Sequence, residues 1–481
     1  MDSWVGVAKI VGVALDWTRG GPELLIALDR GSGRSLGFQL QGWFRDAIRS
    51  GRLERGERLP ASRALAAQLG VSRGVVVDTY EQLESEGYLQ STQGAGTVVA
   101  AAAGDDAPAP AARPARPRWD VDFEYGVPDV RSFPVRDWVW AMGEAARRAT
   151  AEDLTDEYGG GSAELCELLA GYLRRVRGAA VRADSVVVCA GFRYGLNLVL
   201  RAMGPAGVTT VALEDPGPVD HDAIVRRSGM QVVHVPVDEE GLDVAALART
   251  PARAVVVTPA HQAPTGVVLA PPRRQQLAAW AHDRDGFVIE DDYDAEFRYD
   301  RQPVGAVQGL APDRVVAMGS TSKTLSPTLR MGWIVCPPRL RDAVLAEKQL
   351  LGRGAPGLDQ LALAAMIESG RYDRHLRQMR ALYKRRREVL VAAVARHAPG
   401  VAVTGLAAGC HAVLRLPAPV TEQEAVEACA RESVAVYGMS RFRSDGSADP
   451  AQLVLGFGNV RERAIADAVA RVGGALSGMV R

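Results

Sequence analysis

The chain of 481 residues has little of several features that mark particular classes of protein. Its five cysteines are scattered, with no C-x-x-C pair and no histidine at metal-ligand spacing, which argues against a disulfide framework or a zinc finger and favours reduced thiols. It has no uninterrupted apolar run of membrane-spanning length, because the stretch from Trp4 to Trp17 is broken by Lys9 and Asp16. We therefore expect a soluble, cytoplasmic protein without a metal site.

The chain also lacks a surplus of either charge. Lys and Arg together number 57, and so do Asp and Glu. Zero net charge argues against general binding to polyanions, so any contact with nucleic acid has to come from a local face. Hydrophobic residues make up 47% of the chain, enough for sizeable cores, and the length predicts two to four domains.

Residues 36–100 have the pattern of a small helical module, after a lead-in over 1–35 with weak signals. Apolar residues at helical spacing predict a first helix over 36–50. Two further helices are expected over 63–69 and from residue 73 onward, and a glycine-containing hairpin follows them. Helix, helix, turn, helix and hairpin is the order of a winged helix-turn-helix, so the module is predicted to bind double-stranded DNA.

The predicted DNA contacts lie at the helix starts and at the tip of the hairpin. Ser62 and Ser72 are expected to cap the two later helices, and backbone N–H groups at a helix start favour a phosphate. The hairpin glycines would allow close approach to the DNA backbone. The alternative is a solvated helical bundle, because residues 36–100 hold seven arginines and seven acids. The candidate DNA-binding residues are Ser62, Arg63, Ser72, Arg73, Gly94 and Gly96.

The composition changes after the helical module. Residues 101–120 consist mostly of Ala, Pro, Asp, Gly and Arg and predict a semi-extended linker. Over 121–481 short apolar strands alternate with helices, as in 186–189 followed by 194–203. This alternation predicts an α/β domain with a mostly parallel sheet covered by helices, and near Gly400 it changes to a smaller α+β unit.

A lysine in a loop of small residues is the most informative feature of this second domain. Lys323 lies in the run GSTSKTLSPTLRMG, whose hydroxyls and guanidinium suit a phosphate. Such a lysine can form a Schiff base with an aldehyde. Upstream, an apolar strand ends in acids and a phenol that include Asp291 and Tyr293. Together these groups are the parts that a pyridoxal phosphate (PLP) site requires.

The chemistry assigns a role to each candidate. Lys323 would form the Schiff base, Asp291 would keep the pyridine nitrogen protonated, and Tyr293 would hydrogen-bond the ring's 3′ oxygen. Each element alone also fits a surface lysine, a strand-end carboxylate or a tight turn, but their joint order and spacing favour the cofactor site. The predicted phosphate anchors are Ser320, Ser322, Arg330 and the N–H groups of Gly191 and Phe192, where a helix begins.

Two sets of motifs carry a family resemblance. GRLERGERLPASRALA at 51–66 and YEQLESEGY at 80–88 resemble the winged-helix domain of GntR-type repressors. EDPG at 214–217, TPAHQAPTG at 258–266 and IEDDYDAEFRY at 289–299, with LVLGF further on, resemble fold-type-I aminotransferases and, more narrowly, the MocR subfamily of GntR regulators. The resemblance implies the PLP-dependent transferase fold type I behind an amino-terminal winged helix.

The MocR resemblance also implies an assembly and an effector. It implies a head-to-tail homodimer in which Tyr158 reaches the partner's cofactor phosphate. It further implies that an amine or amino acid, or PLP itself, is the signal. His261 would lie near the ring, with a structural or helix-capping histidine as the alternative.

Three positions depart from the family pattern. Pro218 replaces a tyrosine that can stack on the ring, so stacking would pass to Phe192 or Tyr194. Asp220 replaces an arginine that can hold a carboxylate, and Ala263 replaces a phenylalanine, which enlarges the pocket. We expect a carboxylate beside Asp220 to be repelled, and therefore an effector that is bulkier or more cationic than a simple ω-amino acid. Alternative carboxylate holders are Arg441 and Arg443.

Three functions follow from these observations. The first is a PLP-dependent transcription regulator whose effector changes the geometry of paired DNA-binding domains. The second is a working aminotransferase with an appended DNA-binding module. The third is a regulator that has lost the cofactor and uses the large domain for dimerisation. The sequence favours the first. The changes at Pro218 and Asp220 argue against the second, and the retained Asp291, Tyr293, Lys323 and Arg330 argue against the third.

Overall fold

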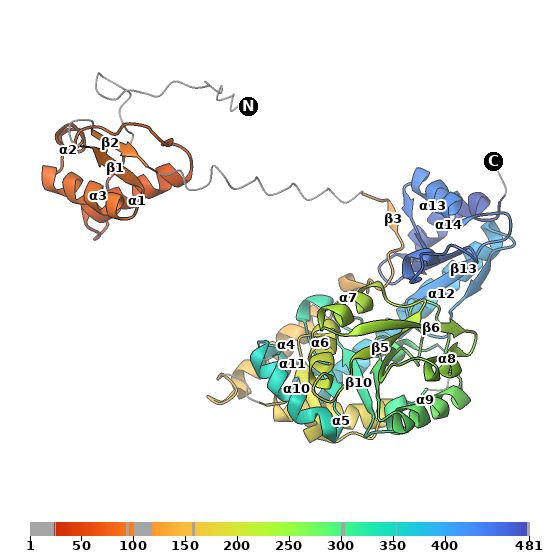
Figure 1. Ribbon diagram of the computed structural model, residues 1–481. Helices are drawn as coiled ribbons and strands as arrows, with labels where there is room; N and C mark the ends of the chain where they lie inside the picture. The colour runs from red at the N-terminus through yellow and green to blue at the C-terminus, as the bar shows by residue number, and fades with distance from the viewer. Residues whose placement is uncertain are drawn as a thin grey trace. The chain divides into compact units, whose positions relative to one another are not determined.

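The computed structural model describes residues 24, 26–92, 96–100, 118–155, 159–299, 304–352 and 354–478. The chain divides into two compact units, here called the amino-terminal unit (1–116) and the carboxy-terminal unit (117–481) (Figure 1). Each unit has its own core and is described by itself. No helix among the described residues is both long and apolar enough to cross a membrane.

The amino-terminal unit is a winged helix-turn-helix, as the sequence predicts. Leu40, Phe44 and Ile48 of the first helix pack with Val76, Leu83 and others in one apolar core. The two strands pair as an antiparallel hairpin, the wing. Its elements are α1 (Leu36–Arg49), α2 (Ser62–Leu69), α3 (Arg73–Ser85), β1 (Leu89–Thr92) and β2 (Gly96–Val99).

One of the two predicted helix caps is present and the other is wrong. The Ser72 hydroxyl accepts a hydrogen bond from the Val75 N–H at 3.4 Å and caps α3. Helix α2 begins one residue earlier than expected, so Ser62 is its first residue and Ala61 occupies the cap position without a side-chain hydrogen bond. The Ser62 hydroxyl instead accepts from Arg73 Nε at 3.4 Å, which ties the starts of α2 and α3 together.

Part of the predicted lead-in belongs to the folded unit. Leu24, Ile26 and Leu28 pack against the apolar core, and Arg30 donates to the Gly70 carbonyl at 2.7 Å. The packed structure of this unit therefore begins before residue 36. Gly94 lies outside the described residues.

The carboxy-terminal unit is built on an eight-stranded sheet in the order β4-β11-β10-β9-β8-β5-β6-β7. The central strands β10, β9, β8, β5 and β6 run parallel, while β11 and β7 are antiparallel to their neighbours. Their bounds are β4 (Val186–Cys189), β5 (Thr210–Asp215), β6 (Gln231–Asp238), β7 (Gly241–Leu242), β8 (Ala254–Val257), β9 (Phe287–Asp291), β10 (Val315–Ser320) and β11 (Gly332–Val335).

Helices cover both faces of this sheet (Figure 1), because successive strand residues point to opposite sides. Phe287 and Ile289 pack with α6, α7 and α10, whereas Val288 between them packs with α8 and α9. The helices are α4 (Val135–Arg148), α5 (Ala163–Arg177), α6 (Phe192–Met203), α7 (Val219–Arg227), α8 (Val244–Ala248), α9 (Pro271–Asp283), α10 (Pro338–Leu350), α11 (Gly357–Glu368) and α12 (Arg371–His397).

The predicted smaller α+β unit follows α12. A four-stranded antiparallel sheet in the order β12-β13-β16-β15 packs with two helices, and the short strands β3 and β14 pair beside it. The elements are β3 (Val121–Asp122), β12 (Ala402–Thr404), β13 (His411–Arg415), β14 (Val434–Ala435), β15 (Tyr437–Gly438), β16 (Gln452–Gly456), α13 (Glu422–Arg431) and α14 (Glu462–Leu476).

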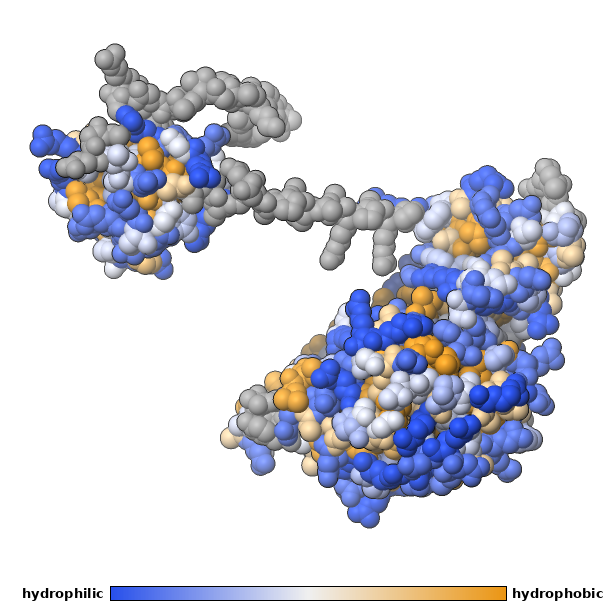
Figure 2. Space-filling model, viewed as in Figure 1, coloured by the Kyte–Doolittle hydropathy of each residue, from blue (hydrophilic) through white to orange (hydrophobic). Residues whose placement is uncertain are grey.

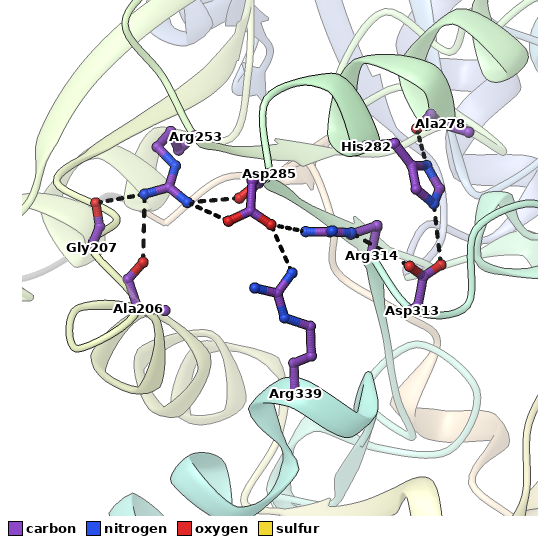
Figure 3. A network of polar contacts seen from close by, with 9 residues as sticks. All are labelled: Ala206, Gly207, Arg253, Ala278, His282, Asp285, Asp313, Arg314 and Arg339. Carbon is purple, nitrogen blue, oxygen red and sulfur yellow. Dashed lines mark hydrogen bonds and ion pairs between the residues drawn. The ribbon is translucent and has the colours of Figure 1, made fainter.

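A charged network fixes the amino-terminal edge of the large sheet (Figure 3). Asp285, just before β9, accepts from Arg314 Nη1 at 2.5 Å, just before β10, and from Arg339 Nη1 on α10 at 2.7 Å. Arg253, before β8, joins the same carboxylate at 3.1 Å. Hydrogen bonds from these guanidinium groups hold the pKa of Asp285 far below its usual range. The network is structural and leaves the opposite, carboxyl edge free for a binding site.

Candidate functional site

Most of the predicted cofactor residues line one cavity at the carboxyl edge of the parallel strands. Its volume is about 500 Å³, within the range usual for small-molecule sites of roughly 300–1,000 Å³. The carboxyl edge is where open α/β sheets bind ligands, because the strand ends and following loops converge there. The predicted residues among its walls are Lys323, Asp291, Tyr293, Ser320, Ser322, Arg330, Phe192, Asp220, Ala263 and Arg441.

Lys323 projects into this cavity from the loop that follows β10. Its side chain is half-buried, and Nζ donates a hydrogen bond to the backbone carbonyl of Gly126. Gly126 has a φ of +78°, and a Cβ atom there would lie 3.0 Å from Lys323 Nζ. A glycine at this position therefore leaves room for the lysine amine.

Asp291 is the last residue of β9 and is buried. Burial raises the pKa of its carboxyl group well above the usual value, as do the neighbouring Asp292 and Asp294, while Lys323 opposes the shift. A buried carboxyl group of this kind is stabilised by a cationic partner, which a protonated pyridine nitrogen would supply. The position fits the predicted role of Asp291.

Tyr293 lines the cavity and is backed by a buried polar cluster. Its hydroxyl lies 3.2 Å from His261 Nδ1, which in turn lies 2.8 Å from Asp294 Oδ2. His411 packs on the His261 ring with 4.7 Å between centroids, and its Nε2 lies 3.0 Å from the Pro264 carbonyl oxygen. The ligand atoms of His261, Asp294 and His411 lie within 4.8 Å of one another. His261 thus supports Tyr293 from behind and is not among the residues of the cavity wall.

The predicted phosphate anchors come together with one exception. Ser320 ends β10, Ser322 follows it, and the exposed Arg330 makes no ion pair within the described part of the chain. Gly191 precedes α6, but its N–H donates to the Cys189 carbonyl at 2.9 Å. The predicted use of the Gly191 N–H is therefore wrong, and the N–H groups at the start of α6, from Phe192 onward, remain to bind an anion. Tyr158 lies outside the described residues.

The mouth of the cavity carries a charge arrangement that the sequence does not reveal. Asp220, the second residue of α7, forms an ion pair with Arg193 in the first turn of α6, and both side chains are more than half exposed. The expected repulsion of a carboxylate by Asp220 is thus partly offset. Arg441 lies on the same cavity with its guanidinium 5.0 Å from the Tyr437 ring centroid and makes no ion pair among the described residues.

Arg443 is not part of the cavity wall. Its Nη1 donates to the carbonyls of Ser447 and Asp449 at 2.8 Å each, and Nη2 donates to Gln452 Oε1 at 3.0 Å. These bonds hold the loop that follows residue 443. Of the two predicted carboxylate holders, Arg441 lines this cavity, whereas Arg443 lines the neighbouring one described next.

A second cavity of about 380 Å³, here called the annex, shares five wall residues with the first. Its own walls include Asp222, Arg226 and His234. The Asp222 carboxylate pairs with both Arg226 and His234. Glu214 also borders the annex, and burial raises its pKa to about 7. The shared residues are Pro218, Val219, His221, Arg441 and Phe442.

Several residues of the site are absent from the sequence prediction. Glu124, Tyr125 and Gly126 reach the cavity from the segment after β3, which has no periodic signal. His221 is buried, and its ring centroid lies 5.4 Å from that of Phe192 with an interplanar angle of 31°. Both rings line the cavity together with Pro218, the residue that replaces the family tyrosine. Burial lowers the pKa of His221 to about 4, so the ring is neutral near pH 7. Tyr194, in the first turn of α6, packs against the apolar core on that face of the sheet.

Of the predicted DNA contacts, Ser62, Arg63, Ser72, Arg73 and Gly96 lie in the described part of the amino-terminal unit, at the starts of α2, α3 and β2. Arg63 and Arg73 are exposed at the starts of α2 and α3, and Gly96 begins the second strand of the wing. The acids of α3 lie further along the helix, and Glu86 is paired with Arg45 at 2.6 Å. The leading end of α3 is therefore left basic, as a recognition helix requires.

Comparison with known proteins defines the class. The family described as aminotransferase class I and II matches residues 122–464, and the family described as bacterial regulatory proteins, gntR family, matches residues 41–99. The multiple substrate aminotransferase from Thermococcus profundus superposes with a TM-score of 0.67 at 22% identity, covering 75% of this chain and 91% of that chain. The α-aminoadipate aminotransferase LysN from Thermus thermophilus superposes with a TM-score of 0.65 at 26% identity, covering 75% and 92%.

Two curated relatives match over nearly the whole architecture. The pyridoxine biosynthesis transcriptional regulator PdxR of Corynebacterium glutamicum is 33% identical over 460 residues, covering 95% of this chain and 99% of the relative. The probable rhizopine catabolism regulatory protein MocR of Rhizobium meliloti is 34% identical, covering 78% of this chain and 80% of the relative. The protein is thus a helix-turn-helix transcriptional regulator with an aminotransferase-like domain. It belongs to the MocR subfamily of GntR regulators.

Proposed function

We propose that this regulator binds PLP through Lys323 and uses it to sense an amine, an amino acid or PLP itself. The observation that carries the proposal is that an amine, a carboxyl group, a phenol, two hydroxyls and a guanidinium line a single cavity of about 500 Å³. When bound, PLP supplies an aldehyde that reacts with amines and a ring that withdraws electrons.

Each wall residue has a task in this proposal. Lys323 would hold the cofactor through its amine, Asp291 would accept a hydrogen bond from the protonated ring nitrogen and keep it protonated, and Tyr293 would hydrogen-bond the ring oxygen. Ser320, Ser322 and Arg330 bind the phosphate, because hydroxyls and a guanidinium are the usual partners of that group. An amine effector competes with Lys323 for the cofactor.

The effector is proposed to be larger than a simple ω-amino acid. The annex adds about 380 Å³ to the cofactor cavity, and Ala263 lines the cavity where the resemblance leads one to expect a phenylalanine. Arg441 stands at the wall that both spaces share and is suited to a carboxylate, while Asp220 is suited to a second amine. An amine with a polar extension satisfies all three features.

A homodimer completes the proposal. Hydrophilic side chains dominate the visible face of the carboxy-terminal unit but apolar patches interrupt it (Figure 2). Val135 and Val139 on α4 are 60% and 65% exposed, and Leu350 at the end of α10 is 78% exposed. Val135 and Val139 lie four residues apart on one face of α4, and a contiguous exposed apolar patch of this kind is typical of association surfaces. We propose that the subunits pair head to tail, with Tyr158 near the partner's cofactor, and that the dimer acts in the cytoplasm.

DNA footprinting on the region upstream of its own gene tests the regulatory function. A dimer is expected to protect two half-sites, as a direct or inverted repeat, and the protection should change when PLP and an amine are added together. The same change should be absent in Lys323→Ala, which retains the amino-terminal unit. A single unrepeated site, or an equal response in the variant, would contradict the proposal.

The second candidate function is transamination, favoured by the aminotransferase fold of the carboxy-terminal unit. Sustained conversion of an amino donor and a keto acid by the purified protein would establish it. We expect single-turnover chemistry at most, because Pro218 and the paired Asp220 depart from the aminotransferase-like pattern at the ring and at the carboxylate.

A further inference from the structure

A buried ion pair lies on the face of the sheet opposite the cofactor cavity. Arg177, the last residue of α5, has a side chain that is 2% exposed, and its Nε donates to Asp292 Oδ2 at 2.5 Å. Its Nη1 donates to the Val304 carbonyl at 2.6 Å. Asp292 directly follows β9, so this pair adjoins Asp291 in the chain while facing away from the cavity.

Strand alternation gives the three successive acids at the end of β9 different surroundings. Asp291 lines the cofactor cavity, whereas Asp292 lines a closed space on the other face. Glu290, on that same face, accepts hydrogen bonds from two backbone N–H groups at 3.0 Å each. Asp292 has one ion-pair partner within the described residues, and that partner is Arg177. Arg177 therefore supplies the positive charge that compensates the Asp292 carboxylate.

Solvent screens this pair only weakly, because the side chains of Arg177 and Asp292 are 2% and 14% exposed. The adjoining space measures only about 20 Å³, room for roughly one water molecule. An unpaired carboxylate in such a place acts strongly on its neighbours. The charged groups around Asp291 are Asp292, Asp294 and Glu214, which favour its protonation, and Lys323, which opposes it.

We propose that Arg177 is a positioning residue of the cofactor site, which compensates the charge of Asp292 from the far face of the sheet and so makes it easier for Asp291 to ionise opposite a cationic ring nitrogen. The inference rests on the proposed binding of PLP. Without Arg177, the uncompensated carboxylate of Asp292 further disfavours ionisation of Asp291. A protonated Asp291 does not stabilise a protonated ring nitrogen.

The test measures the dissociation constant of PLP and the pH dependence of the visible band for four proteins. These are wild type, Arg177→Gln, Asp292→Asn and the double variant. Arg177→Gln is expected to bind PLP about tenfold or more weakly, since an unpaired buried charge shifts a neighbouring pKa by a unit or more. Asp292→Asn should bind at least as tightly as wild type. The double variant should return to within roughly threefold of wild type, because a neutral pair replaces the ion pair.

A second buried pair provides the matched control. Arg386 Nη2 donates to Asp129 Oδ2 at 2.6 Å, with both side chains 4% exposed, and neither residue lines the cofactor cavity. Arg386→Gln should lower thermal stability while leaving the affinity for PLP unchanged.

The outcomes separate the possibilities. The positioning role is overturned if the double variant binds PLP as weakly as Arg177→Gln, or if Arg177→Gln binds PLP as tightly as wild type. If Arg177→Gln does not fold, a double variant that fails to bind PLP overturns it. A wild-type protein without a visible band removes the proposed cofactor and this inference with it.

Discussion

Lys323 and Gly126 meet at the cofactor cavity although 197 positions separate them in the chain: the lysine amine donates to the glycine carbonyl. The contact places the reactive amine against a backbone segment that enters from the smaller α+β side of the unit, after β3. A side chain at position 126 would therefore compete with the lysine for space. This relationship provides a test that removes no functional group.

Gly126→Ala is expected to weaken PLP binding. The new Cβ atom would lie 3.0 Å from Lys323 Nζ, and a φ of +78° costs a non-glycine residue about 1 kcal/mol. Gly229→Ala is the matched control, because its φ of +81° imposes the same strain with no atom within 4 Å of the new Cβ. Spectral titration with PLP should separate the two variants, and equal affinities would show that crowding at Lys323 has no effect.

Glu214 predicts a pH dependence of stability. Its folded-state pKa is about 7 against an ordinary 4.5, because burial outweighs hydrogen bonds from Thr258 and Gln262. The group is protonated in both states below pH 4.5, and as pH rises through 7 the folded state has to ionise a buried carboxyl group and loses stability. The loss amounts to at most roughly 3 kcal/mol.

Glu214→Gln should therefore gain stability relative to wild type as pH rises from 5 to 8. Urea unfolding at several pH values measures the difference in free energy of unfolding. Glu388→Gln on α12, where the side chain is 56% exposed, is the control. Its difference in free energy of unfolding from wild type should not change with pH. A flat difference for Glu214→Gln as well would mean that the buried carboxyl group is not the cause.

Asp220→Asn tests the charge at the cavity mouth. The change releases Arg193, so amines that also carry a carboxylate should bind up to about fivefold more tightly, in keeping with exposed ion pairs worth roughly 0.2–1 kcal/mol. Asp184→Asn is the control, because Asp184 forms an exposed ion pair with Arg182 and lines neither the cavity nor the annex. Titration of the PLP-loaded protein with an amine series measures the shift, and an effect of equal size in both variants would count against a role for Asp220 in selectivity.

Arg73→Ala and Arg63→Ala test the DNA surface. Each removes one candidate phosphate contact, so the slope of log affinity against log salt should fall by about 0.9 per contact. Arg45→Ala should leave the slope unchanged, because Arg45 is held by both carboxylate oxygens of Glu86. Fluorescence anisotropy with a defined duplex at several salt concentrations gives the slopes. Identical slopes in all three variants would exclude this face.

The sequence predicts most of the fold and many of the residues that line the cavity, because those features are local. The cap at Ser72, the lysine loop and the acid at the end of β9 each depend on a few consecutive residues. The errors have a different origin. The Ser62 hydroxyl accepts a hydrogen bond from Arg73 and the Gly191 N–H donates one to the Cys189 carbonyl, and the sequence pattern does not encode these contacts. Partners distant in the chain, such as Gly126, are likewise invisible until the fold brings them together.

The measurement that tests the account most directly is the visible absorption spectrum of the purified protein with PLP, before and after borohydride, beside Lys323→Ala. The account predicts a Schiff-base band in the wild type and no such band in the variant. Borohydride should abolish the band, because it reduces the Schiff base and so fixes the cofactor on the lysine. A wild type without the band, or a variant that retains it, would contradict the assignment of Lys323 as the cofactor lysine.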